Sequence, residues 1–247
     1  MSGPAPSRGE HEPVGDGGSS DTRERLLDAA EDLFVRKGYA GTSVRDIVAA
    51  AGCNLAAVNY HFGGKHKLYE EVLRRRLGVM REQRLAAVAS AARAAGGGGD
   101  LEATLRAYAE TFLAPLQEDP EGQHPLRLML REIVDPLLPQ DFFRRELILP
   151  VNRALAAAVT RTAPELSERE ARLCVQSFVG QLLHAMHARR FAFTDLEDSG
   201  DALSIVEIAD HIVRFTVAGV ARLRHEPGPR PGRSRPVPAD RPHRRDR

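Results

Sequence analysis

A short stretch of amide, phenol and imidazole side chains carries the most distinctive chemistry in this sequence. Residues 54–62 read Asn-Leu-Ala-Ala-Val-Asn-Tyr-His-Phe. With Asn54 as N-cap, a helix begins near residue 55, and Leu55, Val58 and Phe62 form an apolar stripe that can be buried. An amide can pair with a base edge, and phenol and imidazole can donate to phosphate oxygens, while alanines let the backbone approach a groove. The opposite face therefore predicts contact with DNA through Asn54, Ala56, Ala57, Asn59, Tyr60 and His61.

A second short helix is predicted directly before this one. Ser43-Val44-Arg45-Asp46 has the form of a capping box with Asp in place of Glu, and an apolar stripe follows to Ala51. The intervening Ala-Gly-Cys-Asn gives helix-turn-helix spacing, in which the second helix enters the major groove. Ser43 and Arg45, with Lys65 on the first turn of the next helix, are then candidates to hold phosphates. An ordinary amphipathic helix pair would show the same pattern, so this alternative stays open.

The surrounding residues resemble a known family. Gly38 to Ile47 read Gly-Tyr-Ala-Gly-Thr-Ser-Val-Arg-Asp-Ile, and Tyr-His-Phe-Gly-Gly-Lys follows at residues 60–65. Together with Ala51-Gly52 and Leu68-Tyr69, these motifs resemble the N-terminal domain of TetR-type repressors over residues 22–72, and Asn-Tyr-His-Phe resembles the CecR-like subgroup. Val48 and Cys53 replace residues that are common in the family, away from the predicted DNA face.

The resemblance implies an all-α fold: an N-terminal three-helix helix-turn-helix domain plus a C-terminal helical bundle for ligand binding and dimerisation. It also implies a homodimer on palindromic double-stranded operator DNA, released when a small molecule moves the helix from about residue 64 to 95. The alternative is a helical ligand- or protein-binding module that no longer reads a specific operator. The expected divisions are a disordered arm, the DNA-binding domain with its connector helix to about 95, the regulatory domain and a disordered basic tail, at residues 1–19, 20–72, 73–223 and 224–247.

Composition agrees with a helical, non-enzymatic protein. The 247 residues are 42% hydrophobic with net charge +1, and they lack hairpin signals and β-branched runs. Between Thr22 and Arg76, ten Lys/Arg face seven Asp/Glu, a mild excess that suits phosphate neutralisation. No nucleophile elbow, phosphate loop or dinucleotide fingerprint occurs, so neither catalysis nor a cofactor is expected. The sequence has no long apolar run and only two isolated cysteines, which favours a cytoplasmic protein without a membrane segment.

Charged residues in an apolar segment are candidates for effector binding. Arg131, Glu132 and Asp135 follow Leu126 to Leu130 and either pair internally or orient a small molecule, and both alternatives stay open. Pro150 is expected to kink a helix over 141–162 and to free the carbonyl of Glu146. We expect an apolar or amphipathic effector contacted by Met129, Arg131, Glu132, Asp135, Phe143, Leu183 and His184.

The last two predicted helices, from Ser167 to about Arg190 and from Ser204 to Leu223, are apolar on more than one side. Such helices must be buried against a second partner as well as their own domain, which predicts a homodimer interface. His184 and His187 lie three residues apart, but no further ligand is near in sequence, so no metal is expected. The predicted interface residues are Val175, Val179, Leu182, Met186, Ile205, Ile208, Ile212 and Phe215.

Overall fold

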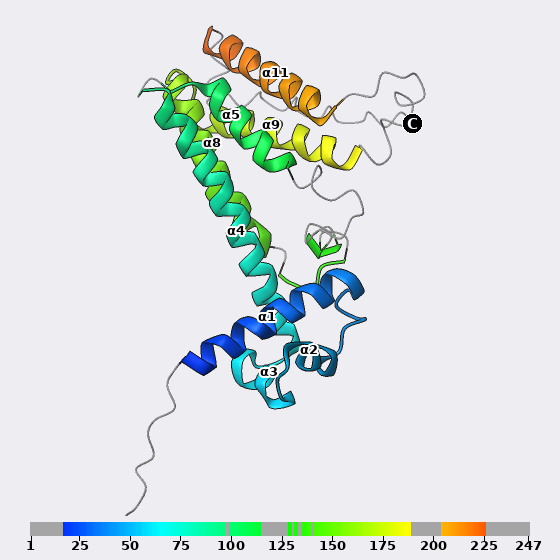
Figure 1. The fold of residues 1–247 in the computed structure, drawn as a ribbon. Coiled ribbons are helices and arrows are strands. Elements are labelled where there is room, and N and C mark those ends of the chain that lie inside the picture. Colours follow the sequence, from blue (N-terminus) through cyan, green and yellow to red (C-terminus); the bar gives the residue numbers. More distant parts are fainter. Residues whose placement is uncertain are drawn as a thin grey trace, which may run out of the picture. The chain divides into compact units, whose positions relative to one another are not determined.

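The computed structural model describes residues 17–96, 99–114, 128–129, 131–132, 135–139, 141–188 and 204–225. Every regular element in these ranges is helical, which confirms the all-α fold class (Figure 1). Two compact units divide the chain, and each is described by itself: Met1–Ser90 with Ala107–Ala154, and Ala91–Arg106 with Leu155–Arg247. This division differs from the boundary predicted at residue 72, because residues 131–146 bond to the N-terminal helices. Most of the predicted arm and tail lies outside the described residues.

Four helices form the N-terminal part of the first unit: α1 (Gly17–Lys37), α2 (Val44–Ala51), α3 (Leu55–Phe62) and α4 (Lys65–Ala94). The first three contact one another around fully buried side chains, which are Leu26, Ala30, Phe34, Ile47 and Val58. The α1 helix begins at Gly17, although the sequence predicted a disordered arm to residue 19. Ser20 and Asp21 are exposed, so α1 extends into solvent at these residues.

Both short helices have the caps that the sequence predicted. The Ser43 hydroxyl accepts a hydrogen bond from the Asp46 backbone, while the Asp46 carboxylate accepts one from the Ser43 backbone at 3.0 Å. The Asn54 side-chain oxygen accepts a hydrogen bond from the Ala57 N–H at 3.0 Å. Gly52 ends α2 with a φ of 63°, in the left-handed region that favours glycine. These local bonds fix where the two helices begin and how they are joined.

A π-helical turn lies directly before the helix that contains Pro150, where the sequence predicted a kink. The turn η1 (Arg144–Ile148) runs directly into α8 (Leu149–Thr162), with Pro150 in the first turn of α8. The prediction that the Glu146 carbonyl lacks its usual helical partner is supported by its contact with Arg81, whose Nη1 donates to this oxygen at 2.7 Å. The π turn thereby ties the start of α8 to α4.

The remaining helices are α5 (Leu101–Leu113), α9 (Glu168–Ala188) and α11 (Ile205–His225). The Asp100 side chain caps α5 by accepting a hydrogen bond from the Ala103 N–H at 3.0 Å. The α9 and α11 helices pack against each other within the second unit. Their buried faces consist of Ala171, Val175, Phe178 and Leu182 on α9 and Ala209, Ile212, Val213 and Val220 on α11. No helix among the described residues is long and apolar enough to cross a membrane.

Candidate nucleic-acid interface

The α3 helix separates a buried apolar side from an exposed polar side. Val58 and Phe62 are 0% and 6% exposed, whereas Tyr60 is 81% exposed. Asn59 is also exposed, and the half-buried ring of His61 lies edge-on to that of Tyr60 with centroids 4.9 Å apart. The predicted outward residues therefore face solvent on a helix whose opposite side is anchored in the core. Such a face can offer an amide, a phenol and an imidazole to a groove.

Leu55 does not lie in the buried stripe that the sequence predicted. Its side chain is 51% exposed, beside the exposed Ala56 on the first turn of α3. Helical spacing alone placed Leu55 with Val58, but the core contacts the helix only from Val58 onward. An apolar side chain at this position can contact a thymine methyl group, so Leu55 joins the candidate interface as a residue that sequence reasoning missed.

The side chains of Ser43 and Arg45, both predicted to contact phosphates, differ in whether their donor groups are already bonded within the protein. The Ser43 hydroxyl donates to the Asp46 carboxylate at 2.8 Å, so its donor is already engaged in the cap. This cap lowers the pKa of Asp46, through the backbone and side-chain hydrogen bonds from Ser43. Arg45 is exposed, and no ion pair of its side chain is found within the described part of the chain. Arg45 is thus the better placed of the two residues to reach a phosphate.

Lys65 lies over an aromatic ring at the start of α4. Its Nζ atom is 4.1 Å from the centroid of the Tyr39 ring, and burial lowers the pKa of the ammonium group from its ordinary value. A cation over a ring face keeps its charge while its position is restricted. Gly63 and Gly64, with φ of 73° and 132°, form the turn that brings Lys65 next to α3. The turn and the ring together fix the position of this cation at the start of α4, three residues after the end of α3.

Tyr69 on α4 forms a buried polar contact with Glu132. The Tyr69 hydroxyl donates to Glu132 Oε2 at 2.8 Å, and each of the two residues is 2% exposed. The other carboxylate oxygen accepts from the backbone N–H groups of Leu137 and Leu138, at 2.7 and 2.5 Å. Burial, with the neighbouring carboxylate, raises the pKa of Tyr69, which therefore remains a neutral donor. Because both Glu132 oxygens are engaged, the prediction that Glu132 contacts an effector is replaced by a role in joining α4 to residues 137–138.

Arg131 also bonds to the N-terminal helices. Its Nη1 atom donates to the carbonyls of Phe34 and Val35 in the last turn of α1, at 3.3 and 3.4 Å. A cation beside the C-terminal carbonyls of a helix interacts favourably with the helix dipole. No ion pair of Arg131 with Glu132 or Asp135 is found among the described residues, and the ligand contact stays a prediction.

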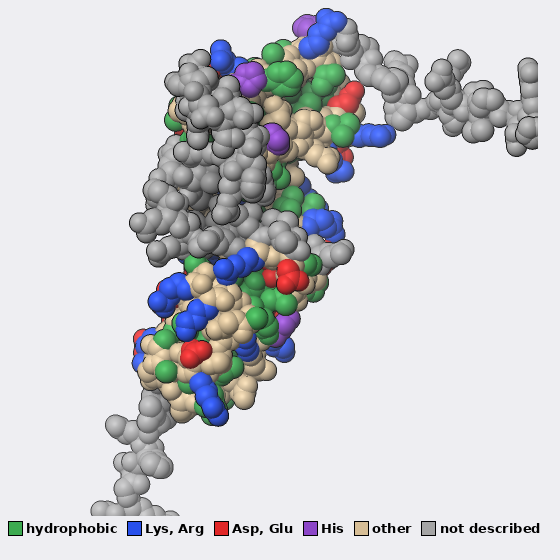
Figure 2. Space-filling view, turned by 90° about the vertical axis from the view of Figure 1, so that its right-hand side faces the viewer, with side chains coloured by type: hydrophobic (Ala, Val, Ile, Leu, Met, Phe, Trp, Pro, Cys, Tyr) green, Lys and Arg blue, Asp and Glu red, His purple; other side chains and the backbone are tan. Residues whose placement is uncertain are grey.

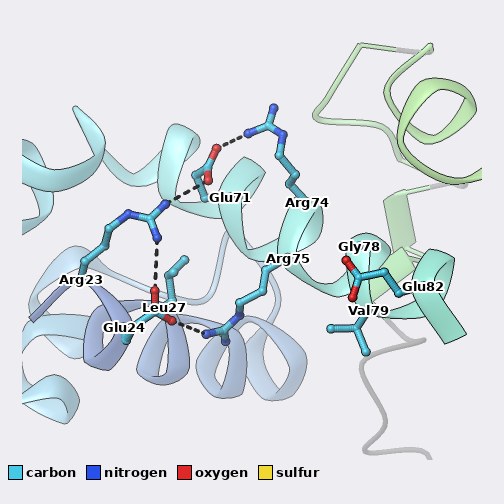
Figure 3. Close-up of a pocket in the computed structure, with 9 residues that line it drawn as sticks. All are labelled: Arg23, Glu24, Leu27, Glu71, Arg74, Arg75, Gly78, Val79 and Glu82. Carbon is cyan, nitrogen blue, oxygen red and sulfur yellow. Dashed lines mark hydrogen bonds and ion pairs between the residues drawn. The ribbon is translucent and has the colours of Figure 1, made fainter. Parts of the chain in front are cut away.

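Ion pairs join α1 to α4 along one side (Figure 3). Arg75 pairs with Asp28 and Glu31 at 2.7 and 2.6 Å, and Arg23 pairs with Glu71 at 3.1 Å. The picture shows Arg23 directed at Glu24 and Glu71, and Arg75 directed at Glu24, in a pocket lined by α1 and α4. On the face drawn in Figure 2, Lys and Arg side chains are spread over the end of the molecule that holds α1 to α3, with few acidic side chains between them. The paired arginines hold α4 in place and leave Arg45 and Lys65 as the better candidates for phosphates.

The other predicted effector residues are divided between the two compact units. Met129 is buried, Phe143 half-buried and Asp135 exposed, all in the first unit. Leu183 and His184 are exposed on α9, in the second unit. The effector contacts therefore remain a prediction.

Three predicted dimer-interface residues face the core of their own subunit instead. Val175, Leu182 and Ile212 are 2%, 0% and 5% exposed, because α9 and α11 bury these side chains against neighbouring elements of the same unit. Phe215, by contrast, is 62% exposed, and its place in a dimer interface stays a prediction. Periodicity showed that both helices are apolar on more than one side, but it did not show which apolar side is covered within the monomer. The exposed apolar residues of this pair are Leu173, Leu183, Val206, Phe215 and Leu223.

Two family models match this chain. Residues 26–72 match the family described as "Bacterial regulatory proteins, tetR family", and residues 101–220 match "HTH-type transcriptional dual regulator CecR, C-terminal domain". The first of these covers the helix-turn-helix built above. The second covers α5, α8, α9 and most of α11.

Curated relatives match over a short region. The "HTH-type transcriptional repressor KstR2" of Rhodococcus jostii (strain RHA1) is 42% identical over 57 residues, 23% of this chain and 28% of the relative. The "Probable HTH-type transcriptional regulator YttP" of Bacillus subtilis (strain 168) is 40% identical over 52 residues, 21% of this chain and 25% of the relative. The matched region thus spans only about a quarter of the length of these two relatives. Both relatives are named as regulators and not as enzymes, in agreement with the sequence analysis.

Solved structures share the fold over most of their length. A protein assigned to the TetR family of transcriptional regulators from Mesorhizobium loti has a TM-score of 0.61 at 20% identity, covering 81% of this chain and 97% of that one. A TetR-family transcriptional regulator from Streptomyces coelicolor has a TM-score of 0.57 at 21% identity, covering 81% and 90%. At this identity the likeness concerns the fold: an N-terminal helix-turn-helix followed by a helical domain.

Proposed function

The chain belongs to the TetR family of bacterial regulatory proteins, with a C-terminal domain of the CecR type, and we propose that it is a homodimeric transcriptional repressor. In this proposal the α3 helix enters the major groove of a near-palindromic operator. A small molecule bound in the C-terminal domain, here taken as residues 73–223, lowers the affinity for the operator.

The observation that carries the proposal is the exposed polar face of α3, whose opposite side is packed in the hydrophobic core. Asn59 and Tyr60 project from a helix held by Val58 and Phe62, and α2 is capped so that it begins at a fixed point. The face has the donors and acceptors that read base edges, with Lys65 and Arg45 at its ends for phosphates. Asn54 keeps its amide N–H groups for DNA, since its side-chain oxygen serves as the cap.

A dimer that pairs α9 and α11 of two subunits would cover the apolar side that the monomer leaves exposed. Leu173 and Leu183 lie on the outer side of α9, and Phe215 on the outer side of α11. A Cβ added at Gly180 or Gly219 would meet nothing within 4 Å, so helices of a partner can approach closely at these positions. A C2 dimer of this kind would space its two α3 helices by about one turn of DNA, roughly 34–36 Å, or a multiple of that distance.

Binding of the effector would release the operator through α4, the helix that begins at Lys65 and ends at Ala94. Its contacts support a role as lever, because Tyr69 bonds to Glu132 and Arg81 bonds to the Glu146 carbonyl. A shift of residues 132–146 would therefore be transmitted to α4 and the adjoining α3. A ligand that prefers the non-binding arrangement by about 1–3 kcal/mol would lower operator affinity roughly 5- to 150-fold.

The test is a fluorescence-anisotropy titration of the full chain with DNA from upstream of its own gene. We expect saturable binding that scrambled DNA of the same composition does not compete away, and loss of this preference in Asn59→Ala. An exposed substitution on α8, Thr160→Ala, lies outside the proposed interface and serves as the matched control, which should leave binding unchanged. Equal affinity for scrambled and upstream DNA, with no other genomic fragment preferred, would refute the repressor and favour a helical binding module.

A further inference from the structure

Arg84 on α4 is a buried cation without a described anionic partner. The residue is 7% exposed, and its guanidinium carbon lies 4.4 Å from the centroid of the Phe112 ring and 5.9 Å from that of Tyr108. Both rings belong to α5 and to the same compact unit as Arg84. Across the described ranges, no carboxylate lies within ion-pair distance of Arg84 and no oxygen accepts a hydrogen bond from it.

Arginines on earlier turns of the same helix are different. Arg74 pairs with Glu70 and Glu71, Arg75 pairs with Asp28 and others, and Arg81 donates to the Glu146 carbonyl. These residues are also more exposed to solvent than Arg84. Arg84 is therefore the least exposed of these four arginines and the one without a described acceptor, although its guanidinium nitrogens are not among the fully buried atoms that lack a partner.

In this setting the guanidinium group of Arg84 has neither a counter-ion nor hydrogen-bond acceptors among the described residues. Ring faces attract the cation, but they do not replace acceptors for its five N–H donors. Burial lowers the pKa of Arg84, opposed by the nearby Tyr108, yet arginine stays charged at any physiological pH. A charge that is mostly removed from solvent and has no counter-ion is destabilising. Solvent still reaches the guanidinium nitrogens of Arg84, so an anion can approach them. The position thus has the physical requirements for binding an anion that comes from outside the chain.

We infer that Arg84 binds the acidic group of the effector, and that the effector is a monoanionic carboxylic acid with an apolar body. This inference rests on the proposed function and specifies its ligand. The planar guanidinium matches a carboxylate with two parallel hydrogen bonds. One arginine neutralises one charge, so a dianionic phosphate would keep a net charge in an apolar surrounding. Leu77 and Val88 lie on the same buried side of α4 as Arg84, which suits an apolar body.

The place of Arg84 would also couple the ligand to DNA. Arg84 lies on the helix that begins at Lys65, beside the candidate DNA face. A carboxylate held by the guanidinium would bear directly on α4, without an intermediate element. Reciprocity then requires that the acid bind the free protein more tightly than the protein on its operator.

The test compares acids with neutral compounds of the same shape, by calorimetry on the full DNA-free chain. The probes are 4-phenylbutyrate and octanoate, each paired with the corresponding alcohol. We expect at least one acid to bind about tenfold or more tightly than its alcohol, since a charge-assisted bidentate contact is lost. Arg84→Met should bring the acid down to the affinity of the alcohol, and Arg84→Lys should retain part of the difference. Arg93→Met, at an exposed arginine of the same helix, is the control and should change nothing.

Thermal unfolding without ligand gives a second readout. If the guanidinium waits for an anion, Arg84→Met removes an unpaired buried charge, and the melting temperature should stay equal or rise. A fall of several degrees would show a purely structural arginine and overturn the inference. So would equal binding of acid and alcohol, an unchanged acid affinity in Arg84→Met, or no binding of either acid.

Operator binding is measured on the same samples, so that the two proposals fail separately. Wild-type protein that binds its operator but neither acid would refute the carboxylate site and leave the repressor standing. Protein that binds an acid through Arg84 but no operator would refute the repressor and leave the anion site standing.

Discussion

The hydrogen bond between Tyr69 and Glu132 should be one of the strongest single polar contacts in the first unit. Both residues are 2% exposed, and the hydroxyl and carboxylate oxygens are 2.8 Å apart. Tyr69→Phe removes the hydroxyl and leaves Glu132 Oε2 buried without its described donor. The ring remains, so its contacts with Phe34 and Tyr39, at centroid distances of 5.1 and 5.0 Å, are kept. The substitution therefore isolates the polar contribution.

The expected cost follows from the chemistry of the pair. A hydrogen bond to a charged group contributes about 1.5–3 kcal/mol to the free energy of unfolding. For a chain of this size, each kcal/mol lowers the melting temperature by about 2–4 °C, so Tyr69→Phe should lower it by roughly 3–12 °C. Glu132→Gln should also destabilise the protein, because it removes the charge that strengthens three hydrogen bonds. In the double variant the costs should fall short of their sum by about 1–3 kcal/mol.

Tyr39→Phe is the matched control. Tyr39 belongs to the same aromatic cluster, and no hydrogen bond of its hydroxyl is present in the described residues, so its loss should cost under about 0.5 kcal/mol. Urea unfolding gives the free energies, and hydrogen exchange gives a local readout that does not assume one cooperative transition. The Leu137 and Leu138 amides should exchange faster in Glu132→Gln, since both donate to that carboxylate. Equal costs for the two tyrosine variants, or additive costs in the double variant, would refute this account.

The remaining predictions concern DNA, assembly and pH. Lys65→Ala should weaken binding to all DNA sequences alike and reduce the salt slope by about one unit, as measured by anisotropy between 50 and 200 mM salt; a selective loss at one base would contradict a phosphate role. Phe215→Glu should give a folded monomer by light scattering and circular dichroism, whereas Leu182→Glu should unfold the second unit because that side chain is 0% exposed; a Phe215→Glu dimer would rule out this interface. Because the pKa of Asp46 is lowered in the folded protein, the stability that its cap contributes is complete above the pKa of the unfolded chain, about 3.9, and is lost as pH falls through the lower folded pKa. The free energy of unfolding of Asp46→Asn should therefore depend less on pH in this range than that of the wild type. The same pH dependence in both proteins would argue against the cap.

Local sequence determined the features that depend on neighbours in the chain. The caps at Ser43 and Asn54 and the start of α5 after Asp100 follow from side chains that reach backbone groups three residues away. Pro150 has no N–H to donate to the carbonyl of Glu146, which accepts a hydrogen bond from Arg81. The outward face of α3 follows from a 3.6-residue period once its start is known. These features could be predicted because the interactions that determine them involve only residues a few positions apart in the sequence.

Tertiary structure decided every question about which of several apolar or charged groups finds a partner. Leu55 has the spacing of a core residue, yet the core does not reach the first turn of α3. Leu182 and Phe215 read alike as apolar positions, and only the packing of α9 on α11 buries one and exposes the other. Glu132 is bonded to Tyr69, 63 residues away, and Arg84 is buried beside rings without an acceptor, contacts that no local pattern encodes. Burial and pairing depend on elements that are distant in sequence, so they are fixed only when the helices have packed.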